Sequence, residues 1–90
     1  MIEREATIVN QEGLHARPAA RIVRLANGFA AEIQLAKDGL EVNGKSIMGV
    51  MMLAAEHGSS IIIRADGADA EQAVQALAEL VATGFGETVP

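Results

Sequence analysis

A two-residue Asp38-Gly39 turn separates two stretches, 31–37 and 40–43, in which apolar and polar residues alternate. An Asp-Gly pair between strand-like segments is a strong signal for a tight hairpin, and such a hairpin joins antiparallel strands. Two more strand-like segments, the second with three consecutive isoleucines, are predicted at residues 2–9 and 60–65. The chain is therefore expected to build an antiparallel sheet.

Three helices are predicted between these strands. Apolar residues spaced three and four apart mark a helix over 16–27, with Pro18 in its first turn and Gly28 after its end. A short helix is predicted over 47–53. A third is expected to begin at Asp69, an N-cap in a capping box with Gln72, and to run to about Ala82.

The predicted order is β-α-β-β-α-β-α in a single domain spanning residues 1–90, with 84–90 as a loose tail. This order favours an α+β fold with helices over one face of the sheet. Nothing in the sequence requires more than a monomer.

Composition excludes several functional classes. Seven Lys and Arg against twelve Asp and Glu give a net charge of −5, which disfavours binding to nucleic acid or to an anionic membrane surface. The absence of cysteine excludes disulfides, zinc–thiolate sites and thiol catalysis. The N-terminus lacks signal-peptide features, and the longest apolar run, 50–55, is too short for membrane insertion. We expect a cytoplasmic protein.

Residues 39–46 fit the phosphate-binding pattern G-x-x-x-x-G-K-[ST], which makes nucleotide binding an alternative hypothesis. A true phosphate-binding loop follows a buried parallel strand and opens a long helix. Here the middle positions alternate like a strand, Gly39 belongs to the hairpin turn, and the following helix is short. We therefore regard the match as accidental and expect no cofactor.

The segment Gly13-Leu14-His15-Ala16-Arg17-Pro18-Ala19 is the sharper functional signal. His15 stands at the mouth of the first predicted helix, whose partial positive charge disfavours imidazolium and favours a neutral, nucleophilic ring. The unpaired N–H groups of the helix and Arg17 would hold a phosphoryl group placed on that ring. The alternative is an ordinary exposed N-cap histidine.

A group of arginines points to a binding partner. Arg17, Arg21 and Arg24 form a basic stripe on the first helix, either a docking surface for an acidic partner or a solvated face.

The only other histidine, His57, lies in a different segment without a carboxylate cluster, so no metal site is predicted.

Ser46 precedes the short second helix, either as a plain N-cap or as a phosphorylation site. Ile47, Met48 and Met51 are candidates for an exposed, adaptable apolar patch that binds partners. The alternative for these side chains is core packing.

The His15 segment, the run Asn43-Gly44-Lys45-Ser46-Ile47-Met48-Gly49-Val50-Met51 and the element order together resemble the HPr family. These proteins are histidine phosphocarriers of the bacterial phosphoenolpyruvate-dependent sugar phosphotransferase system. The resemblance implies an open-faced β-sandwich with a four-stranded antiparallel sheet of order 1-4-2-3 and three helices on one face.

The resemblance also implies that His15 accepts a phosphoryl group on Nδ1 from enzyme I and passes it to the A domain of an enzyme II. Arg17 would steady that group. Such a carrier is acceptor and donor rather than a turnover enzyme. Ser46 matches the family's regulatory serine, the target of HPr kinase/phosphorylase, and phosphorylated members act with regulators of carbon catabolite repression in some bacteria.

Two alternatives within this resemblance stay open, a purely regulatory adaptor and the paralogue of the nitrogen branch. Glu12 adds a negative charge close to His15, which could weaken phosphate binding if it points inward. The tail 84–90 runs past the end of shorter members, so the terminal carboxylate found near the active histidine in some of them is not expected here.

Overall fold

A computed structural model describes all 90 residues. Every predicted strand and helix is present, with ends that differ from the prediction by at most two residues. None of the helices has the length and apolar character needed to cross a membrane. The elements are β1 (Ile2–Thr7), α1 (Ala16–Ala26), β2 (Glu32–Lys37), β3 (Leu40–Asn43), α2 (Ile47–Met52), β4 (Ser60–Asp66), α3 (Ala70–Ala82) and a 3-10 helix, η1 (Gly84–Gly86).

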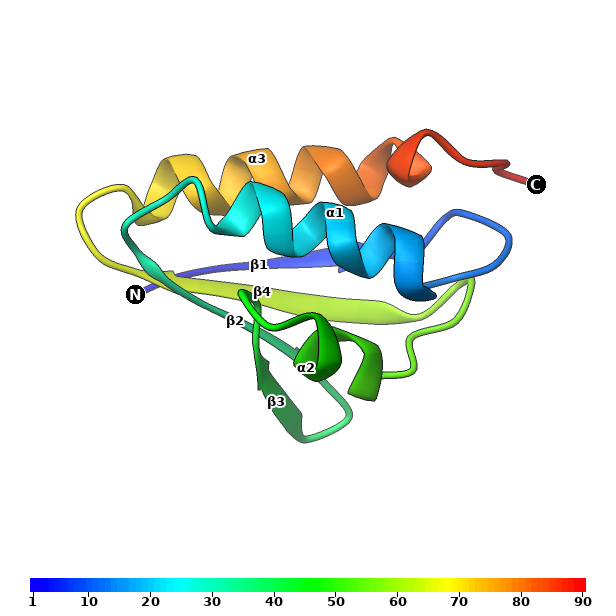
Figure 1. The fold of residues 1–90 in the computed structure, drawn as a ribbon, viewed down its shortest axis with the longest axis horizontal. Coiled ribbons are helices and arrows are strands. Elements are labelled where there is room, and N and C mark those ends of the chain that lie inside the picture. The colour runs from blue at the N-terminus through cyan, green and yellow to red at the C-terminus, as the bar shows by residue number, and fades with distance from the viewer.

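The four strands form one antiparallel sheet in the order β1-β4-β2-β3, as the family resemblance implied. Figure 1 shows α1 and α3 lying side by side along the sheet, with α2 near the end formed by β2 and β3. The predicted hairpin is present, because β2 pairs directly with β3 and Lys37 lies opposite Leu40. The segment that matched the phosphate-binding pattern therefore contains the hairpin strand β3. A strand at this place is not a loop that wraps phosphates, so the nucleotide-binding hypothesis is rejected.

Alternation along the strands places the core between the sheet and the helices. Ile33 and Leu35 of β2 and Ile61 and Ile63 of β4 are buried in one cluster of 21 residues. The helices supply residues of the same cluster, among them Ile22, Val50 and Leu77. The opposite face of the sheet is polar, and there the Arg64 guanidinium pairs with the carboxylates of Glu3 and Glu41.

Asp69 stands at the N-cap of α3, but the predicted capping box is wrong, since its side chain makes no capping hydrogen bond. Its carboxylate instead accepts hydrogen bonds from the backbone N–H groups of Ala30, at 2.9 Å, and Ala31, at 2.8 Å. The bond from Ala30 is the main reason that the pKa of Asp69 lies below its usual value, against an opposing effect of burial. Asp69 therefore joins α3 to the start of β2.

Replacing Asp69 with asparagine is expected to lower the melting temperature at neutral pH and to flatten the pH dependence of stability in acid. The pKa of Asp69 is lower in the folded state than in the unfolded chain, where it is about 3.9. The carboxylate thus stabilises the fold above about pH 4, and this contribution is lost as the pH falls toward the folded-state pKa. Thermal unfolding between about pH 2 and pH 7 measures it.

Asp38→Asn is the matched control, because the Asp38 side chain is exposed in the hairpin turn and its replacement keeps the turn chemistry. Its pH profile should parallel that of the wild type. Parallel profiles for Asp69→Asn and the wild type would contradict the assigned role of the carboxylate.

The C-terminal tail is packed against the domain, so the prediction of a loose segment over 84–90 is wrong for its first part. Gly84, Phe85 and Gly86 have φ of 68°, 59° and 74°, which makes a left-handed turn. The turn inserts the Phe85 side chain into the core, where it is 1% exposed. Arg21 of α1 donates a hydrogen bond from Nη1 to the Phe85 carbonyl oxygen, at 2.8 Å. Gly84 and Gly86 adopt this left-handed conformation without steric cost, and so permit the turn.

Candidate functional site

His15 is the N-cap of α1, as predicted, but its side chain does not cap the helix. The turn before it depends on Gly13, which has φ of +70° and lies close to the carbonyl group of Ala55. A Cβ at Gly13 would be 2.6 Å from that oxygen, which also accepts the backbone hydrogen bond of Leu14 at 2.9 Å. Only glycine fits this approach, and the turn sets where His15 enters the helix.

The His15 ring is turned toward the tail and is half-buried, so the alternative of an ordinary exposed histidine does not describe it. Nε2 lies 3.0 Å and 3.1 Å from the two carboxylate oxygens of Glu87. It also lies 3.5 Å from Oε2 of Glu12, so this carboxylate approaches the ring. Their side chains differ in burial, since Glu87 is 19% exposed and Glu12 is 76% exposed.

Glu87 is the functional candidate that sequence reasoning missed. It stands 72 residues from His15 in a segment predicted to be loose, and no local pattern links the two. A partial signal was available, because some family members place a terminal carboxylate near the active histidine. In this chain the carboxylate there belongs to a side chain.

The position of Glu87 is held by the turn that precedes α1. Asn10 is fully buried, and its Nδ2 donates to the carbonyl oxygen of Gly13 at 2.9 Å and to Oε1 of Glu87 at 3.1 Å. The backbone N–H of Gln11 donates to the carbonyl oxygen of Thr88 at 2.9 Å. The tail is thus bonded to this turn at Glu87 itself and at the next residue, Thr88.

Electrostatics favour an ionised Glu87. The hydrogen bond from His15 is the largest cause that lowers the pKa of Glu87, and burial opposes it. The hydrogen bond from Asn10 and the charges of His15 and Arg17 lower this pKa further. Glu87 is therefore a carboxylate at neutral pH.

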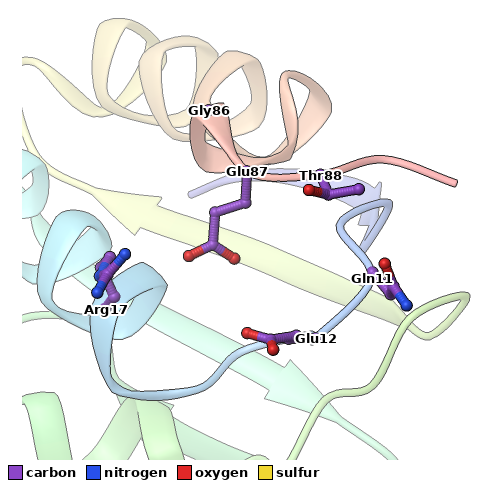
Figure 2. Close-up of a pocket in the computed structure, with 6 residues that line it drawn as sticks. All are labelled: Gln11, Glu12, Arg17, Gly86, Glu87 and Thr88. Carbon is purple, nitrogen blue, oxygen red and sulfur yellow. The ribbon is translucent and has the colours of Figure 1, made fainter.

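A polar hollow opens beside the ring. In Figure 2 the Glu87 carboxylate points into the space between Arg17 on α1 and the turn that carries Glu12. The Arg17 side chain is exposed and makes no ion pair within the chain, so its charge is available to an anion. The residues that line the hollow are Gln11, Glu12, Arg17, Gly86, Glu87 and Thr88.

The same place brings together three groups that could hold a metal ion. Ligand atoms of Glu12, His15 and Glu87 all lie within 4.8 Å of one another. Sequence reasoning did not find this set because Glu87 is distant along the chain. His57 is exposed and takes no part in it.

The predicted basic stripe serves more than one purpose. Arg17, Arg21 and Arg24 are all exposed on α1. Arg17 faces the hollow, whereas the guanidinium of Arg21 binds the tail through the Phe85 carbonyl group. Arg24 lies with Arg21 along a shallow groove beside α3. That the stripe docks an acidic partner stays a prediction.

Ser46 is the N-cap of α2, and its Oγ accepts a hydrogen bond from the backbone N–H of Gly49 at 3.1 Å. Ile47, Met48 and Met51 are exposed, so the predicted apolar patch is present on the surface. The core side chains of this segment are instead Val50 and Leu53. Because α2 packs against α1, the patch and His15 belong to neighbouring helices (Figure 1).

Comparison with known proteins gives consistent matches over nearly the whole chain. Residues 2–83 match a family profile described as the PTS HPr component phosphorylation site. The chain is 46% identical over 87 residues to the phosphocarrier protein HPr of Cupriavidus necator, which covers 97% of this chain and 98% of that protein.

Solved structures agree with these sequence matches. HPr-C-His from Thermoanaerobacter tengcongensis has a TM-score of 0.94 and 44% identity, covering 99% of this chain and 100% of that one. Crh, a catabolite repression protein of Bacillus subtilis, has a TM-score of 0.76 and 40% identity, covering 93% and 97%. The Crh structure is described as a domain-swapped dimer.

Proposed function

The chain belongs to the HPr family of phosphocarrier proteins, and from this premise we propose that it carries a phosphoryl group on His15 from enzyme I to the A domains of enzyme II. The observation that supports this most directly is the setting of His15. Its Nε2 is bonded to Glu87, its Nδ1 makes no hydrogen bond within the chain, and Arg17 faces the adjoining hollow.

The proposed transfer is a displacement at phosphorus. The lone pair of Nδ1 attacks, an N–P bond forms, and the bond between phosphorus and the donor breaks with its electron pair leaving on the donor. The phosphoryl oxygens would meet the unpaired N–H groups at the start of α1 and the Arg17 guanidinium. Catalysis here is positioning and charge compensation, as is general for phosphoryl transfer.

The test is incubation of the purified protein with enzyme I, Mg²⁺ and phosphoenolpyruvate, followed by intact mass and phosphorus NMR. We expect one acid-labile phosphate, which then moves to a purified enzyme II A domain. If an enzyme I that phosphorylates its own partner leaves this protein unmodified, the carrier role is wrong and the regulatory adaptor takes its place. Transfer only to the nitrogen-branch acceptor would instead assign the protein to that branch.

We also propose that Ser46 is phosphorylated by an HPr kinase/phosphorylase, and that the modified protein binds regulators of carbon catabolite repression. Ser46 caps α2, where the N-terminal end of the helix favours a negative charge. The exposed Ile47, Met48 and Met51 beside it suit several partners, with Arg21 and Arg24 on the neighbouring helix. The similarity to Crh supports this second role.

Replacing Ser46 with aspartate is expected to slow phosphorylation of His15 by enzyme I about tenfold, equivalent to ~1.4 kcal/mol of activation free energy. The added negative charge repels an acidic partner that contacts α1 and α2 together. The fold should be kept, because aspartate is also a good N-cap. Rates are measured by rapid quench with phosphorylated enzyme I. Ser46→Asn keeps the cap without the charge, and rates for Ser46→Asp equal to that control would refute the docking argument.

We place the protein in the cytoplasm and propose that it acts as a monomer. A monomer presents the hollow beside His15 to large partners without obstruction. Sedimentation at working concentration gives the mass, and a stable dimer like that described for Crh would contradict this part of the proposal.

A further inference from the structure

We propose that Glu87 is a positioning residue for His15: its carboxylate keeps a proton on Nε2, leaves Nδ1 as the nucleophile and stabilises the charge that the ring gains on phosphorylation. The inference rests on His15 being the phosphoryl acceptor. It adds a role for the C-terminal tail, which becomes part of the site.

The tautomer follows from the hydrogen bond. A glutamate side chain is ordinarily ionised at neutral pH, and an ionised carboxylate has no proton to donate. The two contacts with its oxygens, at 3.0 Å and 3.1 Å, therefore require Nε2 of His15 to be the donor. A neutral imidazole carries one N–H, so Nδ1 holds the free lone pair.

The carboxylate is built into the domain rather than attached to a free end. Phe85, two residues before it, is buried in the core. Asn10 uses Nδ2 for both the Gly13 carbonyl group and Glu87, and its buried Oδ1 makes no hydrogen bond within the chain. The carboxylate of Glu12 is also near Nε2, but its distance to that atom is half an ångström longer than the distance from Glu87, and its side chain is largely exposed. Two glutamates thus stand beside one ring, and only Glu87 is held in place.

The contact gains strength as the reaction proceeds. When Nδ1 forms its bond to phosphorus, the ring keeps the proton on Nε2 and becomes a phosphorylated imidazolium. The new positive charge faces a carboxylate that is already hydrogen-bonded to Nε2–H, in the same way that an aspartate supports the histidine of a serine hydrolase. Interactions that strengthen toward the transition state are those that accelerate a reaction.

The experiment compares Glu87→Gln, which removes the charge but keeps the shape, with the wild type and with Glu71→Gln, which makes the same change at an exposed position on α3. Phosphoramidate serves as the donor, because this small molecule phosphorylates imidazole directly and needs no docking surface. The rates are followed by intact mass in the presence of a chelator. Nitrogen NMR of the His15 ring at about pH 8.5, well above the ordinary histidine pKa of about 6.5, reports which nitrogen carries the proton.

We expect Glu87→Gln to lower the phosphorylation rate about tenfold, by analogy with the ~10–100-fold cost of losing a hydrogen-bond partner that orients a metal-bound histidine. The share of rings with the proton on Nε2 should fall in the same variant. Glu71→Gln, at an exposed position on α3 outside the hollow, should change neither quantity. Unchanged melting temperatures would show that the tail stays docked.

Equal phosphorylation rates in Glu87→Gln and the wild type would overturn the inference. So would a rate loss with an unchanged proton position, since the effect would then not pass through the ring. Neither result depends on enzyme I. Failure of transfer from enzyme I alone would instead count against the proposed function.

Discussion

Replacing His15 with alanine is expected to abolish phosphorylation by enzyme I and phosphoenolpyruvate, while the protein stays folded. The ring is the proposed nucleophile of the site. Because the His15 side chain does not cap α1, its loss should leave the helix start unchanged. Intact mass after incubation should show no added phosphate, and thermal unfolding should show a cooperative transition.

His57→Ala is the matched control, since His57 is exposed and lies outside the hollow. It should be phosphorylated at the wild-type rate. An acid-labile phosphate that forms equally fast on the His15→Ala protein would place the acceptor elsewhere and refute the proposed function. A second effect is specific to this structure: the pKa of Glu87 should rise in His15→Ala, because its main cause of lowering is gone.

Replacing Phe85 with alanine is expected to lower the free energy of unfolding by about 3–5 kcal/mol, the usual cost of removing a buried phenylalanine ring. This is a large share of the ~5–15 kcal/mol by which small domains are stable. Alanine keeps a Cβ at the same left-handed φ of 59°, so the difference reports on the ring and not on the backbone. Urea unfolding measures the change.

Release of the tail should also affect the site, because Phe85 anchors the segment that carries Glu87. The Phe85→Ala protein should therefore react more slowly with phosphoramidate at temperatures where it is still folded. Val89→Ala is the control, since Val89 is exposed near the chain end, and its stability should change by less than about 0.5 kcal/mol. A change below about 1 kcal/mol for Phe85→Ala would show that the tail adds little to the core.

The arrangement of strands and helices was largely predictable from local patterns. The Asp38-Gly39 turn predicted the hairpin, alternation predicted the strands, and three-and-four spacing predicted α1. These signals are short-range, because a strand or helix repeats within a few residues. The order 1-4-2-3 did not follow from them. It came from the family resemblance and is confirmed by the pairing of β4 with both β1 and β2.

The site was predictable only in part. His15 at the start of a helix with Arg17 in its first turn, Ser46 as an N-cap and the exposed patch on α2 all follow from local sequence. Each of these features depends on neighbours within one or two helical turns. The first part of the tail was predicted wrongly, because Gly-Phe-Gly is compatible with both a flexible end and a fixed left-handed turn.

The sequence by itself therefore predicted His15, Arg17 and Ser46 as candidates for the chemistry and determined which helices begin at or beside them. Only the tertiary structure decided what His15 contacts, since Glu87 lies 72 residues away. The same holds for Asp69, whose partners are 38 and 39 residues distant. The physical reason is common to both: a glycine-rich or polar segment has no strong local preference, and its conformation is set by burial and hydrogen bonds to distant parts of the chain.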